Sequence, residues 1–226
     1  MDARRIAGVV FNVVIFGVLL FGPAGTLNWW RAWVFLGVVL IATVTMMTTV
    51  FRGNEELLKE RFKPPIQKDQ PLADKIVLMV FVALFFALIV MIPLDVFRWH
   101  WLAGPGTVVS WLGLALFAGG WWLIAISLKT NPFAAPVVKL QAERRQTVIA
   151  SGPYRLIRHP MYSGGVLLMI GIPLWLGSYA AALFAAVPIL VLALRIIFEE
   201  RFLQRELKGY TEYEAKVRYR LVPFLW

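Results

Sequence analysis

The sequence contains no cysteine and only two histidines, His100 and His159. Without cysteine the chain has no disulfide, no thiolate metal site and no cysteine nucleophile. The two histidines fall on opposite sides of the membrane in the topology that the charges predict, so a histidine-rich site is excluded and no metal is expected. No Ser-His-Asp arrangement and no glycine pattern of a nucleotide-binding loop is present.

Charged residues are also scarce. Asp, Glu, Lys and Arg make up 16% of the chain against 60% hydrophobic residues, and the mean hydropathy is +0.71. A soluble domain is usually roughly half apolar, so this composition indicates a membrane protein. Nothing resembles a soluble second domain, and we expect residues 1–226 to form a single integral membrane domain.

The apolar residues fall into long runs, each near the roughly 20 residues that a helix needs to cross a bilayer. We therefore predict an all-α fold, a polytopic transmembrane bundle of five to six spans. The runs lie near residues 6–27, 29–51, 75–97, 108–128, 162–176 and 179–197. The first run resembles a signal peptide, but it is long enough to span and no clear small-residue cleavage site is present, so we interpret it as a span.

Only Gly177 and Ser178 separate the last two runs. This spacing predicts a C-terminal helical hairpin with a short first arm, so the alternative to six spans is five spans plus a re-entrant arm. Residues 1–128 then hold four N-terminal spans, and residues 129–226 hold the hairpin and the expected catalytic region.

Basic residues outnumber acidic ones by 23 to 13, giving a net charge of +10. Nucleic acid is one partner for such a chain, but these residues flank apolar runs, which is the placement expected for cytoplasmic loops beside anionic lipids. In a six-span topology all of them except Arg31 and Arg98 lie on one side of the membrane. We therefore predict that the N- and C-termini are both cytoplasmic and that the membrane, in a bacterium, is the inner membrane. The expected partner is the lipid bilayer, and no nucleic acid partner is expected. The sequence does not indicate the oligomeric state.

Three polar segments lie on the predicted cytoplasmic side. Residues 54–62 open with Asn54 and two acidic residues, which predicts a short interfacial helix. Residues 151–165 and 195–226 lie at the two bases of the hairpin, and its short turn places those bases side by side. Arg158, His159 and Tyr162 should then face Arg195, Glu199 and Glu200.

Each of these residues also has an ordinary structural interpretation. An isolated Arg158 is a positive anchor, His159 an interfacial histidine, and Arg195 can pair with Glu199 one helical turn later. The density of polar types within a dozen residues exceeds what an anchor needs, and ionisable groups at the edge of a span are functional candidates.

These residues carry a resemblance to the isoprenylcysteine carboxyl methyltransferase family, which is related to the membrane phospholipid methyltransferases. The family's first signature is Gly-Pro-Tyr followed after four residues by His-Pro-x-Tyr-x-Gly, and it begins here at Gly152. The second is an Arg before a Glu-Glu pair, followed by spaced tyrosines. Here it comprises Arg195, Glu199, Glu200, Tyr210, Tyr213, Val217, Arg218 and Pro223. The likeness covers about the last 95 residues, and the first four spans match only in being hydrophobic.

The resemblance implies S-adenosylmethionine as cofactor, bound in a cytoplasmic pocket. It implies catalytic roles for Arg195, which would meet the substrate, and for Glu199. The cofactor-binding residues that it implies are Gln146, Thr147, Val148, Ile149, Tyr154, Arg158, His159, Pro160, Met161, Tyr162, Glu199 and Glu200. Gln146 stands where the family usually has His, which retains a hydrogen-bonding side chain but not a titrating ring.

The implied activity is methyl transfer to a lipophilic, membrane-partitioned or prenylated substrate, with the carboxylate of a prenylated cysteine as one acceptor. A phospholipid amine and a small thiol are alternative acceptors. A nicotinamide-dependent membrane reductase of related architecture and a non-enzymatic membrane protein with a vestigial pocket are the other classes.

Overall fold

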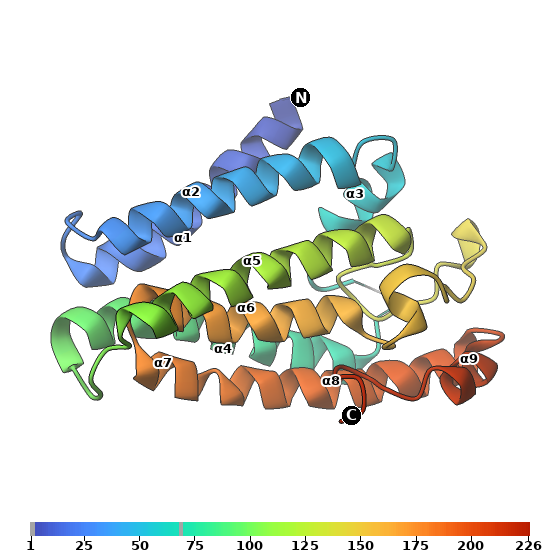
Figure 1. Cartoon of the computed structure of the whole chain (residues 1–226). Helices are drawn as coiled ribbons and strands as arrows, with labels where there is room; N and C mark the ends of the chain where they lie inside the picture. The colour runs from blue at the N-terminus through green and yellow to red at the C-terminus, as the bar shows by residue number, and fades with distance from the viewer. Residues whose placement is uncertain (1–2, 68–69) are drawn as a thin grey trace.

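The computed structural model describes residues 3–67 and 70–226, and within them every regular element is helical. The long helices run nearly parallel, as Figure 1 shows. The apolar ones are α1 (Ala3–Ala24), α2 (Trp30–Thr45), α4 (Leu72–Leu94), α5 (Thr107–Thr130), α6 (Pro160–Leu176), α7 (Tyr179–Phe184) and α8 (Ala186–Glu206). Short π-helical turns extend α2 over Met46–Val50 and α4 over Asp95–Trp99.

Five of the described helical segments are long and apolar enough to cross a membrane, and α6, with 17 residues, is a shorter apolar helix. The predicted bundle is thereby confirmed, with boundaries that shift by a few residues. The first span, for example, ends at Ala24 instead of Leu27 because Gly25 takes a positive φ of 70° and stops the helix.

The polar segments gather at one end of the bundle, on the right in Figure 1, which we call the polar end. It holds α3 (Glu55–Arg61), α9 (Tyr210–Lys216), and two 3₁₀ turns at Ala142–Arg144 and Gly152–Arg155. The predicted interfacial helix is α3, and Asn54 caps it by accepting a hydrogen bond from the Leu57 backbone N–H at 3.3 Å.

The predicted hairpin turn is also present, since α6 ends at Leu176 and α7 begins at Tyr179. Gly177 has a φ of 105°, which favours glycine, and the hydroxyl of Ser178 caps the next helix through the Ala181 N–H. That hydroxyl donates to the buried carboxylate of Asp95 at 2.7 Å, which fastens the turn to the end of α4.

Helices α5 and α6 pack with their backbones almost in contact. A Cβ atom on Gly164 would lie 2.7 Å from the carbonyl oxygen of Gly120, and one on Gly171 would lie 2.6 Å from the carbonyl oxygen of Gly113. No side chain fits in either place. Small residues let helices approach this closely within membranes, and this contact fixes the height and direction of α6, whose first turn reaches the polar end.

Replacing Gly164 by Ala should therefore destabilise the protein by about 1–3 kcal/mol, the usual cost of overpacking. Gly165 is the matched control, because a Cβ atom there would have no neighbour within 4 Å and alanine favours the helix. Thermal unfolding in detergent measures both variants. Equal melting temperatures for the two would contradict the close contact.

Candidate active site

The cavity at the polar end is enclosed by parts of the chain that are distant in sequence. The segment between α5 and α6, the first turn of α6, the last turns of α8, and α9 form its wall. The lining residues are Asn131, Phe133, Ala134, Ala135, Val137, Val138, Lys139, Gln146, Thr147, Val148, Ile149, Tyr154, Arg158, His159, Met161, Tyr162, Glu199, Leu203, Leu207, Tyr210 and Tyr213. Ten of the twelve predicted cofactor-binding residues are among them, and the exceptions are Pro160 and Glu200.

Gly152 explains how the Gly-Pro-Tyr motif places Tyr154 in this wall. Its φ is +54°, and a Cβ atom there would lie 2.9 Å from the Thr130 hydroxyl oxygen. The turn therefore requires glycine. The Tyr213 hydroxyl donates to the Tyr154 carbonyl at 2.7 Å, and burial raises the pKa of the Tyr154 phenol to about 12, so that the ring stays neutral.

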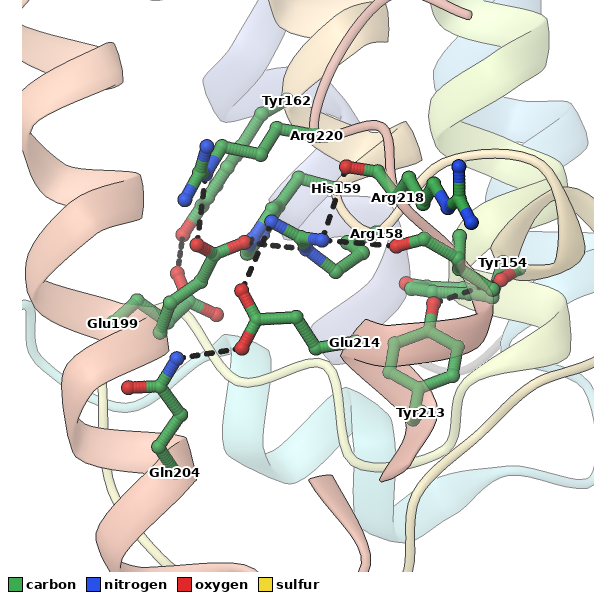
Figure 2. A network of polar contacts seen from close by, with 12 residues as sticks. Tyr154, Arg158, His159, Tyr162, Glu199, Gln204, Tyr213, Glu214, Arg218 and Arg220 are labelled. Atoms are coloured by element: carbon green, nitrogen blue, oxygen red, sulfur yellow. Dashed lines mark hydrogen bonds and ion pairs between the residues drawn. The ribbon is translucent and has the colours of Figure 1, made fainter. Parts of the chain in front are cut away.

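The buried carboxylate of Glu200 joins the two bases of the hairpin. It accepts hydrogen bonds from Arg158 Nε at 2.7 Å and Arg220 Nε at 2.8 Å, and it lies 3.1 Å from His159 Nε2 (Figure 2). Arg158 also lies 3.3 Å from a carboxylate oxygen of Glu214. A buried carboxylate with this many partners links the segments that carry them, and it holds His159 at the edge of the cavity.

The C-terminal segment supports the same motif through its backbone. The Arg158 and His159 N–H groups donate to the carbonyls of Tyr219 and Arg220, both at 2.9 Å, and Arg158 Nη1 donates to the Val217 carbonyl at 2.9 Å. The second family signature therefore holds the first in place. The sequence predicted that these two segments lie side by side, but it did not predict a partner for Arg220.

Glu199 differs from Glu200 although the two are adjacent. It lines the cavity, and its Oε2 accepts from the Tyr162 hydroxyl at 2.5 Å. The Tyr162 ring lies parallel to the His159 imidazole, with centroids 5.5 Å apart. Within the described chain Glu199 Oε1 accepts no hydrogen bond, so this cavity-lining carboxylate retains one acceptor oxygen.

Arg195 does not pair with Glu199, which is the pairing that their spacing allowed. Its Nε donates to Asp74 Oδ1 at 2.9 Å, and its Nη2 donates to the Pro136 carbonyl at 2.8 Å. The guanidinium lies 5.7 Å from the centre of the Tyr162 ring, one helical turn deeper in the bundle than Glu199. It is not among the residues that line the cavity.

Asp74, in the first turn of α4, is the residue that sequence reasoning missed. It is 2% exposed, and its Oδ2 accepts from Gln70 Nε2 at 2.6 Å and from the Val138 N–H at 3.0 Å. The carboxylate thus ties α4 to α8 and to the cavity wall. No local pattern identifies it, because an acidic residue in a first helical turn is common for electrostatic reasons alone.

Comparison with known proteins connects this site to a family. Residues 108–209 match the model of the phospholipid methyltransferase family. Protein-S-isoprenylcysteine O-methyltransferase B of Arabidopsis thaliana is 31% identical over 83 residues, which are 36% of this chain and 42% of that protein. By these matches, the C-terminal half of the chain is similar to methyltransferases of the phospholipid and isoprenylcysteine types.

Two relatives from rice have the same level of identity to this chain. The probable protein-S-isoprenylcysteine O-methyltransferases of Oryza sativa subspecies indica and japonica are each 31% identical over 120 residues, or 52% of this chain and 62% of theirs. The chain thus spans less than two thirds of the length of these curated relatives. The matched segment of the family model runs from α5 to the end of α8 and includes most of the cavity wall.

Replacing Asp74 by Asn should lower stability by about 3–5 kcal/mol, because it leaves the buried Arg195 cation without its counter-ion. Glu56→Gln is the control. Glu56 pairs with Arg144 at 3.0 Å, but its side chain is 73% exposed, and such a pair contributes about 1 kcal/mol or less. The two variants are compared by thermal unfolding in detergent, and a comparable shift in both would show that the Asp74–Arg195 pair is dispensable.

Proposed function

We propose that this protein is an S-adenosylmethionine-dependent methyltransferase that acts on a lipidic or membrane-partitioned acceptor. The supporting observation is the convergence of ten of the twelve residues that the family resemblance assigns to the cofactor on one cavity. They come from three separate stretches of chain, the loop at 146–149, the motif at 154–162, and Glu199.

The side chains of this wall match the chemistry of the proposed cofactor. Tyr154, Tyr162 and Met161 provide aromatic and apolar surface for an adenine and for a sulfonium cation. Glu199 keeps one acceptor for an amine or a ribose hydroxyl, and Gln146, whose Oε1 accepts from the Gln141 N–H at 2.8 Å, keeps its amide N–H donors. When bound, S-adenosylmethionine supplies an electrophilic methyl group.

The chain's own contribution to methyl transfer is placement. An in-line displacement needs the acceptor atom about 3–3.5 Å from the methyl carbon, and alignment can supply several kcal/mol of rate enhancement. Rings fixed by hydrogen bonds, such as Tyr162 on Glu199, hold their positions without further ordering.

A carboxylate acceptor is already ionised and needs no base, whereas an amine acceptor does. The carboxylate of a prenylated cysteine is therefore the acceptor that we favour, and the match to phospholipid methyltransferases makes a phospholipid amine the second candidate.

Glu199→Gln should weaken S-adenosylmethionine binding by about 1.5–3 kcal/mol, the contribution of a hydrogen bond to a charged group, or about 10- to 150-fold in Kd. Glu206→Gln, an exposed acidic residue two turns later on α8, is the matched control. Isothermal titration calorimetry with the purified chain gives both values, and a parallel titration with NADPH tests the reductase alternative. Unchanged affinity in Glu199→Gln, or binding of NADPH instead, would refute the cofactor assignment.

We also propose that the polar end is cytoplasmic, so that the cofactor reaches the cavity from the cytoplasm and the acceptor enters from the bilayer. The support is the excess of Lys and Arg in the segments of this end. Tags at residue 1 and at residue 226 should both resist external protease in intact cells and become sensitive after lysis. Cleavage of either tag in intact cells would reverse the orientation.

A further inference from the structure

Arg61, the last residue of α3, approaches the cavity wall at Met161. Its Nη1 is 3.9 Å from the sulfur of Met161, which lines the cavity. No carboxylate in residues 3–67 and 70–226 lies within ion-pair distance of it. The remaining arginines around the cavity differ, since Arg158 and Arg220 pair with Glu200, and Arg195 pairs with Asp74.

The neighbouring acidic residue does not neutralise Arg61. Glu60 is buried, and desolvation opposes its ionisation, but hydrogen bonds from Lys139 and Lys63 outweigh that effect and lower the Glu60 pKa. Lys139 Nζ lies 2.7 Å from Glu60 Oε2, and Lys63 pairs with the other oxygen, Oε1. Both oxygens of this carboxylate are therefore engaged by other cations.

The surroundings of Arg61 penalise its charge further. Desolvation lowers the pKa of its guanidinium, and the positive charge of Arg195 lowers it as well. Arg195 is itself only partly used, since Asp74 and Pro136 engage Nε and Nη2 and no described residue accepts from Nη1. Arg61 thus approaches Met161, Arg195 approaches the adjacent Tyr162, and each guanidinium keeps donors that no described residue accepts.

Arg61 is partly buried. A cation withdrawn from water without a partner costs free energy, and a ligand anion would offset that cost here. The nearby carboxylates are already occupied, Asp74 by Arg195, Gln70 and the Val138 N–H, and Glu199 in part by Tyr162. The flank of α3 is apolar, because Phe62 and Ile66 are 47% and 54% exposed. An amphiphile with an anionic head fits this combination of charges and apolar surface.

The resemblance already implies that Arg195 meets the substrate. We propose that Arg61 is a second arginine of that contact and that it binds the carboxylate of the methyl acceptor. This assignment rests on the proposed function and narrows it to an acceptor that is an anion on a lipophilic molecule. Arg61 is then a binding residue of the reaction, supplied by the short helix between the second and third spans, outside the matched segment 108–209. A phospholipid phosphate has a similar charge, and the experiment separates the two sources.

The test uses the full chain in detergent, labelled S-adenosylmethionine, and N-acetyl-S-farnesylcysteine as acceptor, with its carboxamide as a neutral competitor. Arg61→Gln should raise the KM for the acceptor at least tenfold and reduce the preference for carboxylate over carboxamide by a similar factor. Cofactor affinity should not change. Lys59→Gln removes an exposed cation of the same helix and should leave all three quantities unaltered.

Folding is monitored in the same variants. Because no carboxylate in the described part of the chain pairs with Arg61, Arg61→Gln should melt no lower than the wild type, whereas a merely structural arginine would lower the melting temperature when removed. Arg61→Lys keeps the charge but loses the planar fork that grips a carboxylate with two parallel hydrogen bonds. It should fold and still show a raised KM, which preserves the test if the Gln variant does not fold.

Three results would overturn the proposal. The first is an unchanged carboxylate preference in both Arg61 variants. The second is methyl transfer by the wild type to phosphatidylethanolamine but to no carboxylate, which would assign the two arginines to a phospholipid phosphate. The third is a melting temperature that falls in both variants with no change in KM. Wild-type binding of S-adenosylmethionine is measured separately, so a failure of the proposed function itself is recognised by the loss of that binding.

Discussion

The contact between α5 and α6 is the constraint on which the site depends. Glycines face one another across it, so that the two backbones lie closer than any side chain would permit. Helix α6 is thereby held at one height along α5, and its N-terminal turn carries His159, Met161 and Tyr162 into the cavity wall. A helix packed through flexible side chains would leave this turn free to slide, and catalytic alignment tolerates little sliding.

The adjacent residues Glu199 and Glu200 of α8 have different roles in the site. Glu200 faces the interior junction, where two arginines and a histidine surround its oxygens. Glu199 faces the cavity and keeps an acceptor for a ligand. One step along a helix turns the side chain by about 100°, as 3.6 residues per turn require, so an adjacent pair reaches two surfaces that a single carboxylate could not serve together.

Much of this arrangement was predictable from the sequence where the evidence was local. Long apolar runs predicted the spans, the two-residue turn predicted the hairpin, and the hairpin predicted that Arg158 and His159 would face the glutamates. The irregular segment 131–149 has no periodicity, so the family resemblance alone assigned residues 146–149 to the pocket, and the part played by residues 131–139 was not predicted. Arg195 had a plausible partner one turn away, whereas its actual partner is 121 residues distant. Arg61 was indistinguishable from the other basic residues of its loop.

The pair between Asp74 and Arg195 has a consequence for biosynthesis. An arginine within a membrane helix opposes insertion, by about 2.5–3.5 kcal/mol at the helix centre on translocon scales, and Arg195 lies near the polar end of the apolar run 179–197. Its counter-ion belongs to α4, which leaves the ribosome first. The counter-ion of the last span therefore lies on a helix that is synthesised before it, and that helix is outside the segment 108–209 matched by the family model.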